Sequence, residues 1–382
     1  MHHSCLFEAL VDAGIGISVT ASLRRLYRDL KASVVLEPGT ASRDFDVERG
    51  VRQGDPLSPL LFNLVLNQVL EEVTPIWKRR GYGTNVGQTV SGTRLTHVMF
   101  ADDMTLIARS WTTMKRMLQT LREALARRGL TLHPGKCKIQ NNVPGQELVQ
   151  VTIAEEFVTE IVPASDGVKV LGTMLHLDDP TKHEVQNRIA SAWRMFWSMK
   201  RLLLNRKISL NRRLRLFDAT VSSCLLWCCE SWTPRVKELL SLKAARNGML
   251  RRIVGGARLP DEEWVEWIRR VTRKAMRMAD SAGVRDWIHV HFRCKWLWAG
   301  HVARREPTSW LNRVASWRDS YWQDLVGPLG SARPLRPSRR RWMKWEDSLR
   351  RHCHLEGLGQ WSQLALNHDN WTKQVFAEVM GR

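Results

Sequence analysis

Residues 94–108 read RLTHVMFADDMTLIA and place two adjacent carboxylates, Asp102 and Asp103, between short apolar arms. The arms, residues 98–100 and 104–107, have the pattern of a β-hairpin whose turn carries both acids. Two neighbouring like charges repel each other, and burying them without a counter-charge is unfavourable, so the pair indicates a bound cation. Oxygen ligands favour a hard ion, Mg²⁺ or Mn²⁺. By itself the stretch is also compatible with an ordinary solvent-exposed turn.

Two flanking segments decide between these interpretations. Residues 49–61 read RGVRQGDPLSPLL, and residues 129–138 read GLTLHPGKCK. In their order and separation, the three segments resemble reverse transcriptases of the non-LTR (LINE-like) retrotransposon type. The run RQGDPLSP resembles the nucleotide-pocket motif of that family, and FADD resembles its catalytic turn, in which the family usually has tyrosine in place of Phe100. The resemblance covers about residues 1–175, including Val170, Leu171 and Gly172, which resemble the turn that grips the primer.

The resemblance implies RNA-directed DNA synthesis, in which two divalent ions support phosphoryl transfer from a dNTP to the 3′-hydroxyl of a DNA primer on an RNA template. It assigns Asp102 and Asp103 as ligands of Mg²⁺ or Mn²⁺ and Lys136 as the group that protonates the leaving pyrophosphate. The residues implied at the nucleotide are Gln53, Gly54 and Phe100. For Lys136 the alternative is an ordinary solvated loop lysine.

The resemblance also implies a third metal ligand. In the family, the stretch that corresponds to residues 3–30 directly follows the strand and turn with the first metal-binding aspartate. That aspartate is not among these 382 residues. We therefore expect an N-terminally truncated chain with an incomplete metal site and defective catalysis.

Hydrophobic periodicity predicts an α+β fold. Apolar residues recur at helical spacing in residues 3–30, with interruptions at Gly14 and Gly16, and in residues 111–128, while residues 31–48 have the pattern of a short hairpin. Ser58 is typical of a helix cap and precedes an apolar stretch that ends near residue 73. The resemblance implies that residues 1–178 form a right-hand polymerase palm, an antiparallel sheet with helices, together with incomplete fingers.

The second half of the chain is predicted to be helical. Residues 179–256 contain three apolar stripes and resemble a thumb-like bundle, residues 257–330 form a Trp-rich helical region, and residues 331–382 combine a basic linker with a C-terminal helix. Six basic residues of the bundle are candidate phosphate contacts, although each is also compatible with a solvated helix face. They are Arg188, Arg194, Lys200, Arg201, Arg212 and Arg213.

Charge and tryptophan are concentrated in the same half. Residues 1–180 hold 20 Lys and Arg against 20 Asp and Glu, so the whole net charge of +21 lies in residues 181–382. Of the 18 tryptophans, only Trp77 and Trp111 precede residue 181. Basic side chains neutralise phosphates and flat aromatic faces stack on unpaired bases, so the combination indicates a nucleic-acid partner. Tryptophans at helical spacing are also common in cores.

Composition excludes several other classes of protein. No C-x-x-C pair occurs among the seven cysteines, so neither a disulfide framework nor a zinc site is expected. No apolar run is long enough for a membrane span, and the acidic residues Glu8 and Asp12 are unlike a secretory signal. We therefore expect an intracellular protein, in the nucleus or the cytoplasm. Three interpretations stay open: a piece of a reverse transcriptase, a non-catalytic nucleic-acid-binding protein derived from a retrotransposon, and a relic without a role.

Overall fold

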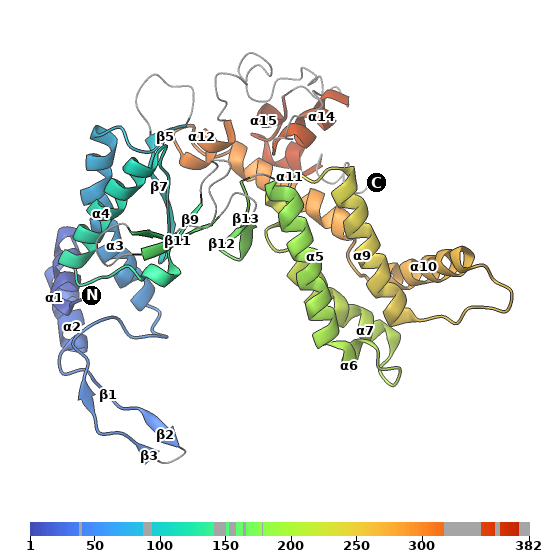
Figure 1. The fold of residues 1–382 in the computed structure, drawn as a ribbon, viewed down its shortest axis with the longest axis horizontal. Coiled ribbons are helices and arrows are strands. Elements are labelled where there is room, and N and C mark those ends of the chain that lie inside the picture. Colours follow the sequence, from blue (N-terminus) through green and yellow to red (C-terminus); the bar gives the residue numbers. More distant parts are fainter. Residues whose placement is uncertain are drawn as a thin grey trace. The chain divides into compact units, whose positions relative to one another are not determined.

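The computed structural model describes residues 1–37, 40–86, 94–140, 150–152, 158–162, 166–177, 179–316, 345–355 and 360–373. The chain divides into two compact units, Met1–Pro163 and Ala164–Arg382 (Figure 1). The division falls before residue 178, the boundary expected from the sequence, because the hairpin that follows Pro163 packs with the later helices. The predicted basic linker at 331–342 lies outside the described residues.

The first unit begins with two helices, α1 (His3–Asp12) and α2 (Ile17–Tyr27). Gly14 separates them with a positive φ of 73°, as the glycine interruption predicted. Their apolar faces form one small core with the start of the next helix. The buried residues of this core are Leu6, Ala9, Leu10, Tyr27, Leu61 and Val65.

Helix α3 (Ser58–Arg79) contributes buried residues to both cores of the first unit. Ser58 is its first residue and not its cap: the Ser58 hydroxyl donates a 2.5 Å hydrogen bond to the carbonyl of Arg52. The helix also continues through Pro75, beyond the end expected from the sequence. Val73 and Trp77 are fully buried on either side of Pro75, so core packing outweighs the lost backbone hydrogen bond.

Helix α4 (Trp111–Arg127) packs beside α3, and its N-cap, Ser110, accepts a 3.2 Å hydrogen bond from the amide of Thr113. Gly129 follows the helix with a φ of 64°, as predicted. The strands β7 (His97–Phe100) and β8 (Asp103–Leu106) form the predicted antiparallel hairpin. Helices and hairpin share a core that contains Leu66, Val69, Val73, Trp77, Met117, Leu121 and Leu125.

The strands of the first unit do not join into one sheet. Antiparallel pairs link β1 (Lys31–Ala32) to β4 (Phe45–Asp46), β2 (Val35–Glu37) to β3 (Thr40–Ala41), and β5 (Thr84–Asn85) to β6 (Arg94–Leu95). A three-stranded sheet has the order β10 (Gln150–Thr152), β11 (Val158–Val162), β9 (Lys138–Gln140), and its β11–β9 pair is parallel. The α+β class is confirmed, but the single antiparallel sheet expected from the sequence is not present in the described residues.

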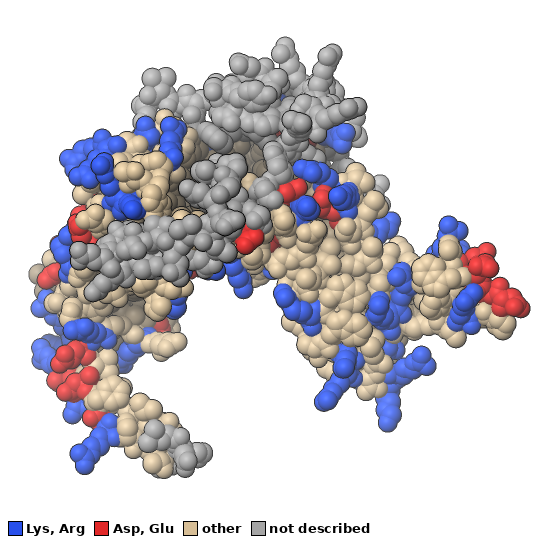
Figure 2. Space-filling model, in the orientation of Figure 1, with Lys and Arg blue, Asp and Glu red and all other residues tan. Residues whose placement is uncertain are grey.

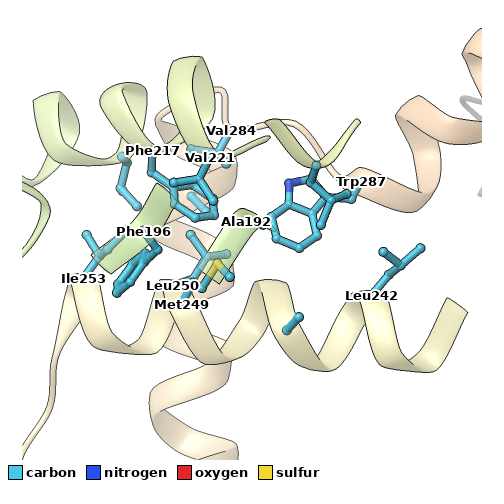
Figure 3. Packing of buried hydrophobic residues seen from close by; sticks show 14 of the residues in the cluster. Ala192, Phe196, Phe217, Val221, Leu242, Met249, Leu250, Ile253, Val284 and Trp287 are labelled. Carbon is cyan, nitrogen blue, oxygen red and sulfur yellow. The ribbon is translucent and has the colours of Figure 1, made fainter. Parts of the chain in front are cut away.

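The second unit begins with the hairpin of β12 (Val168–Val170) and β13 (Thr173–Leu175). Then come α5 (Pro180–Ser198), α6 (Lys200–Leu203), α7 (Leu210–Phe217), a π-helical turn (Asp218–Ser222), α8 (Ser223–Leu225), a 3₁₀ turn (Cys229–Ser231) and α9 (Val236–Val254). The first and third predicted helical stripes correspond to α5 and α9. The second is broken into α7, the π turn and α8. Their shared core includes the side chains drawn in Figure 3, among them Ala192, Phe196, Phe217, Leu250 and Trp287.

The described residues also form the helices α10 (Trp264–Ser281), α11 (Trp287–Ala303), α12 (Trp310–Ser316), α14 (Asp347–Leu355) and α15 (Trp361–Leu364). Three tryptophans, Trp296, Trp361 and Trp371, are buried together between α11 and the C-terminal helices. No described helix has the length and apolar content needed to cross a membrane.

Candidate functional site

The β7–β8 hairpin presents the two adjacent carboxylates at its tip. Phe100 pairs with Asp103 at the last position of the ladder, so Ala101 and Asp102 form the turn. Ala101 has a positive φ of 51°, which costs an L-residue about 1–2 kcal/mol. Both carboxylates are exposed to solvent. The tip therefore carries two carboxylates in or beside a tight turn, and the pairing of β7 with β8 fixes the conformation of that turn.

The two faces of this hairpin differ. On the inner face, Met99 and Met104 are opposite each other and pack against the core formed with α3 and α4. On the outer face, Phe100 lies beside Asp103, and 66% of its surface is exposed. This alternation fixes the Asp103 side chain on the same side of the hairpin as the Phe100 ring. That side is open to a ligand.

The base of the hairpin is anchored to α3. His97 packs edge-to-face against Trp77, with ring centroids 5.9 Å apart, and the amide of Ile107 donates a 2.8 Å hydrogen bond to the carbonyl of Thr96. Burial, and the neighbouring charge of Lys78, lower the pKa of His97. The lowered pKa favours the neutral form of His97, which serves packing at the base, whereas the carboxylates lie at the opposite end of the hairpin.

The predicted nucleotide loop leads into the same helix. Gln53 and Gly54 are exposed, and Gly54 has a positive φ of 89°. Apart from its two neighbours in the sequence, no described residue has a heavy atom within 4 Å of the position that a Cβ of Gly54 would take, so a ligand can approach the backbone there. The carboxylate of Asp55 accepts a 2.9 Å hydrogen bond from the amide of Leu57, which fixes the end of the loop. Loop and hairpin are thus both attached to α3.

Lys136 lies on a different element. It ends a 3₁₀ turn (Pro134–Lys136) ahead of β9, and its side chain is exposed. Among the described residues, no ion pair joins Lys136 to Asp102 or Asp103. Its assignment as a proton donor stays a prediction.

The donor set at the tip is suited to a hard cation but is small. Asp102 and Asp103 supply carboxylate oxygens, the ligands that Mg²⁺ and Mn²⁺ prefer. Among the residues that the structure describes, no three His, Cys, Asp or Glu side chains are grouped so that they could hold a metal ion. The tip alone therefore offers two ligating side chains.

Four of the six basic candidates are exposed on the helices of the second unit, where Figure 2 shows many Lys and Arg side chains. They are Arg194 on α5, Lys200 and Arg201 on α6, and Arg212 on α7. Their guanidinium and ammonium groups are accessible to phosphates.

Arg188 and Arg213 require a correction. Arg188 is buried, and its guanidinium group donates to the Glu184 carboxylate and to the carbonyl of Gly172. Arg213 is also buried, and it donates to the carbonyls of Leu203, Ile208 and Ile253. Burial lowers the pKa of Arg213. Because these donors are used inside the fold, the two arginines are structural, contrary to the expectation that they contact phosphates.

Two residues that sequence reasoning missed lie beside Arg188. Glu184 is buried and accepts a 2.7 Å hydrogen bond from the amide of Met174, and the exposed Trp227 donates a 3.3 Å hydrogen bond to the carbonyl of Leu171. The only sequence signal was the i, i+4 spacing of Glu184 and Arg188 on the apolar side of a helix.

Comparison with known proteins identifies the first part of the chain. Residues 18–175 match the family model of the reverse transcriptase (RNA-dependent DNA polymerase), a range that includes the carboxylate pair, the nucleotide loop and the β12–β13 hairpin. Relatives of this chain include the Pol polyproteins of R2 elements. The chain carries a non-LTR reverse transcriptase domain. The reverse transcriptase domain extends beyond the first compact unit, because β12 and β13 belong to the second.

The relatives differ in how much they share with this chain. A transposon-derived protein of Caenorhabditis elegans is 29% identical over 290 residues, which are 74% of this chain and 95% of that protein. The R2 Pol polyprotein of Nasonia vitripennis is 27% identical over 193 residues, 48% of this chain and 18% of the polyprotein. That of Popillia japonica is 28% identical over 222 residues, 55% of this chain and 29% of the polyprotein. The chain thus spans less than a third of these two Pol polyproteins.

Proposed function

We propose that the reverse transcriptase domain adds nucleotides at the tip of the β7–β8 hairpin, with Asp102 and Asp103 as ligands of Mg²⁺ or Mn²⁺. The observation that carries the proposal is the exposed carboxylate pair, held by a hairpin whose inner face packs on α3. The loop with Gln53 and Gly54 leads into the same helix. In this proposal residues 1–178 act as palm and incomplete fingers and residues 179–256 as thumb.

Each side chain has a part in the proposed reaction. When bound, the divalent ions activate the primer 3′-hydroxyl and stabilise the leaving pyrophosphate. Asp102 and Asp103 hold them, while the open backbone at Gly54 and the amide of Gln53 receive the dNTP. The Phe100 ring lies beside Asp103 on the outer face of the hairpin, where its exposed surface is the proposed contact to the nucleotide. Lys136 is the proposed proton donor to pyrophosphate, with RNA as template and DNA as primer.

We further propose that the 382 residues alone are poor catalysts. The resemblance implies a third carboxylate from a separate strand, and this sequence contains no counterpart of it. Loss of a ligand shared by both ions removes several kcal/mol of transition-state stabilisation, or many powers of ten in rate.

The test is a pair of measurements on the purified chain. Paramagnetic broadening by Mn²⁺ should affect NMR signals of residues 98–106 and should be lost in the Asp102→Asn/Asp103→Asn double variant. The matched control, Asp44→Asn/Asp46→Asn, removes two exposed acids from a different part of the first unit and should leave the broadening unchanged. Broadening that survives the first double variant would refute the ligand assignment.

Primer extension on an RNA template with Mg²⁺ tests whether the 382 residues alone are poor catalysts. We expect no extension by the 382-residue chain, and measurable extension that disappears in Asp102→Asn would show that no further carboxylate is needed.

A second candidate function is nucleic-acid binding without catalysis. It is favoured by the net charge of +21, all of it in residues 181–382, and by the exposed basic side chains of α5, α6 and α7. Binding of single-stranded RNA or DNA should weaken steeply with salt. Binding in the absence of any Mn²⁺ site at the hairpin would favour this candidate over the first. For either function we propose a location in the nucleus or the cytoplasm. Fluorescence microscopy of the tagged chain would test this location.

A further inference from the structure

Two of the seven cysteines lie together in the second unit. Cys229 begins the 3₁₀ turn that precedes α9, and Cys294 lies on α11, which packs against that turn. Cys229 is buried in the core of the unit, and the half-buried Cys294 packs against the same core. Both are free thiols. The pair lies outside residues 18–175, the range that matches the reverse transcriptase family, and the proposed polymerase reaction does not use it.

Hydrogen bonds tie the turn to α11 on both sides of the pair. The carbonyl of Cys229 accepts from the amide of Trp232, at 3.2 Å, and from Nδ1 of His291, at 2.7 Å. Trp232 stacks on the His291 ring, with centroids 5.7 Å apart, and the carbonyl of Trp232 accepts a 2.9 Å hydrogen bond from Nζ of Lys295. His291 and Lys295 lie before and after Cys294 on α11. These contacts hold the two cysteines next to each other.

The two thiols differ in their chemistry. The Cys229 thiol donates a hydrogen bond to the Cys294 sulfur, which lowers the pKa of Cys294 to about 7 although burial opposes the shift. The charge of Glu230 also opposes it, while the guanidinium groups of Arg293 and Arg285 lower the pKa further. The same hydrogen bond, together with burial, raises the pKa of Cys229. Near neutral pH, Cys294 is therefore partly a thiolate and Cys229 is a thiol.

This arrangement is suited to oxidation and not to metal binding. A structural zinc ion needs four ligands, and no three His, Cys, Asp or Glu side chains of the described residues are grouped so that they could hold a metal ion. A partly accessible thiolate reacts with peroxides, and a second thiol beside it can convert the product to a disulfide. Cys294 has the properties of the first thiol, and Cys229 has those of the second.

We propose that Cys294 and Cys229 form a redox-sensitive site, which hydrogen peroxide converts to a disulfide. The Cys294 thiolate attacks one oxygen of the peroxide, the O–O bond breaks, hydroxide leaves, and Cys294 becomes a sulfenic acid. The Cys229 sulfur then attacks the Cys294 sulfur, and the S–O bond breaks. The departing hydroxide takes the proton of Cys229 and leaves as water. In total the two thiols lose two electrons and two protons, and one peroxide becomes two water molecules.

The disulfide joins α11 to the turn that precedes α9. It closes a long loop, from residue 229 to residue 294, and thereby lowers the conformational entropy of the unfolded chain. Oxidation therefore stabilises the second unit, and reduction by a small thiol reverses the change. This site is independent of the proposed polymerase function, so either can fail without the other.

Disulfide mapping of the wild-type chain tests the pairing. The reduced, folded chain is treated at pH 7 with one equivalent of hydrogen peroxide, the remaining thiols are alkylated, and tandem mass spectrometry locates the cross-link. We expect a disulfide between Cys229 and Cys294, while Cys224 and Cys228 are alkylated. Disulfides that join only other cysteines, or complete alkylation of both Cys229 and Cys294, would overturn the proposal.

Trapping of the sulfenic acid tests which thiol reacts first. In Cys229→Ser no thiol is left to resolve the intermediate, so dimedone should label Cys294 after peroxide treatment. In Cys294→Ser, Cys229 should stay unlabelled because it is buried and protonated. Labelling of Cys229 in Cys294→Ser, without labelling of Cys294 in Cys229→Ser, would overturn the assigned roles.

Urea unfolding tests the effect on stability. Oxidation should raise the unfolding midpoint of the wild type by about 1–2 M, and dithiothreitol should reverse the rise. Cys228→Ser is the matched control, because it removes the neighbouring thiol, whose pKa burial raises, and it should retain the rise. Cys294→Ser should show no rise. An unchanged midpoint in a wild-type chain that carries the mapped disulfide, or an equal rise in Cys294→Ser, would overturn the stabilising role.

Discussion

Ala101 illustrates how a single backbone angle shapes the proposed site. It is the residue of the β7–β8 tip with a left-handed conformation, and the two exposed acids, Asp102 and Asp103, follow it in the sequence. An alanine there stores strain that the hairpin ladder must offset. Substitution of Ala101 therefore measures the free energy of the backbone strain at the tip.

Replacing Ala101 should separate backbone strain from chemistry. Ala101→Gly should stabilise the chain by about 1 kcal/mol because glycine adopts positive φ freely, and Ala101→Val should destabilise it by about 1–2 kcal/mol. Urea unfolding measures both changes. Ala13→Gly is the control: Ala13 is exposed and has a φ of −76°, so glycine there should destabilise by about 0.5–1 kcal/mol. If Ala13→Gly and Ala101→Gly changed the stability equally, the interpretation of Ala101 as a strained residue would be contradicted.

Two neighbouring arginines separate structural from binding roles. Arg213→Ala should destabilise the chain by about 2–4 kcal/mol because three backbone carbonyls lose their donor, two of them in buried hydrogen bonds, whereas Arg212→Ala should change stability by less than about 0.5 kcal/mol. In nucleic-acid binding, Arg212→Ala should reduce the slope of log K against log salt by about one. A stability loss in Arg212→Ala as large as that in Arg213→Ala would contradict this division.

At the scale of elements, helix α11 carries a buried amine. Lys295 is 1% exposed, and its ammonium group donates a 2.9 Å hydrogen bond to the carbonyl of Trp232. The ring of Trp345 lies 5.7 Å from its Nζ. Burial lowers the pKa of Lys295 to about 7, although the carboxylate of Asp347 opposes the shift, and on the same helix burial lowers the pKa of His291 to about 3.

The lowered pKa of Lys295 predicts a pH dependence of stability. Between pH 7 and about 10.5 the unfolded lysine is charged while the folded one is neutral, so unfolding takes up a proton and stability rises with pH. The slope is at most about 1.4 kcal/mol per pH unit. Urea unfolding at several pH values should show the rise in the wild type and its absence in Lys295→Met. The prediction would be contradicted if the stability of the wild type fell with rising pH in this range while that of Lys295→Met did not.

Much of the local structure could be predicted from the sequence. The glycine breaks near residue 14, the hairpin at 94–108 and the helix at 111–128 follow from spacing over a few residues. The burial of Arg213 could not be predicted, because one of its acceptors, Ile253, lies 40 residues away. The same holds for Trp227, whose hydrogen-bond partner is 56 residues earlier in the chain. Partners this distant in sequence leave no periodic pattern.

At the scale of the whole molecule, charge is divided unevenly along the chain. All of the net charge lies in residues 181–382, while the carboxylates of the proposed site lie in the first unit. Nucleic-acid affinity should therefore depend mainly on the second half of the sequence.

A charge-matched pair of variants tests this dependence. Arg194→Gln/Arg201→Gln/Arg212→Gln should reduce the salt slope of binding by about two to three, since each exposed arginine neutralises about one phosphate. Arg24→Gln/Arg25→Gln/Arg43→Gln removes the same charge from the first unit and should change the slope by less than one. Fluorescence anisotropy of a labelled oligonucleotide measures both. If both triple variants reduced the salt slope of binding equally, net charge alone would govern binding.

The pairing of Phe100 with Asp103 limits how the hairpin tip can vary during evolution. Side chains of the arms can be exchanged while the ladder is kept, but a single-residue insertion or deletion in the tip would slip the register of one arm. That slip would turn Asp103 toward the apolar surface of α3 and α4 and would place a methionine in water. Length at this position should therefore be fixed among functional copies, and an indel there would mark a copy that has stopped working.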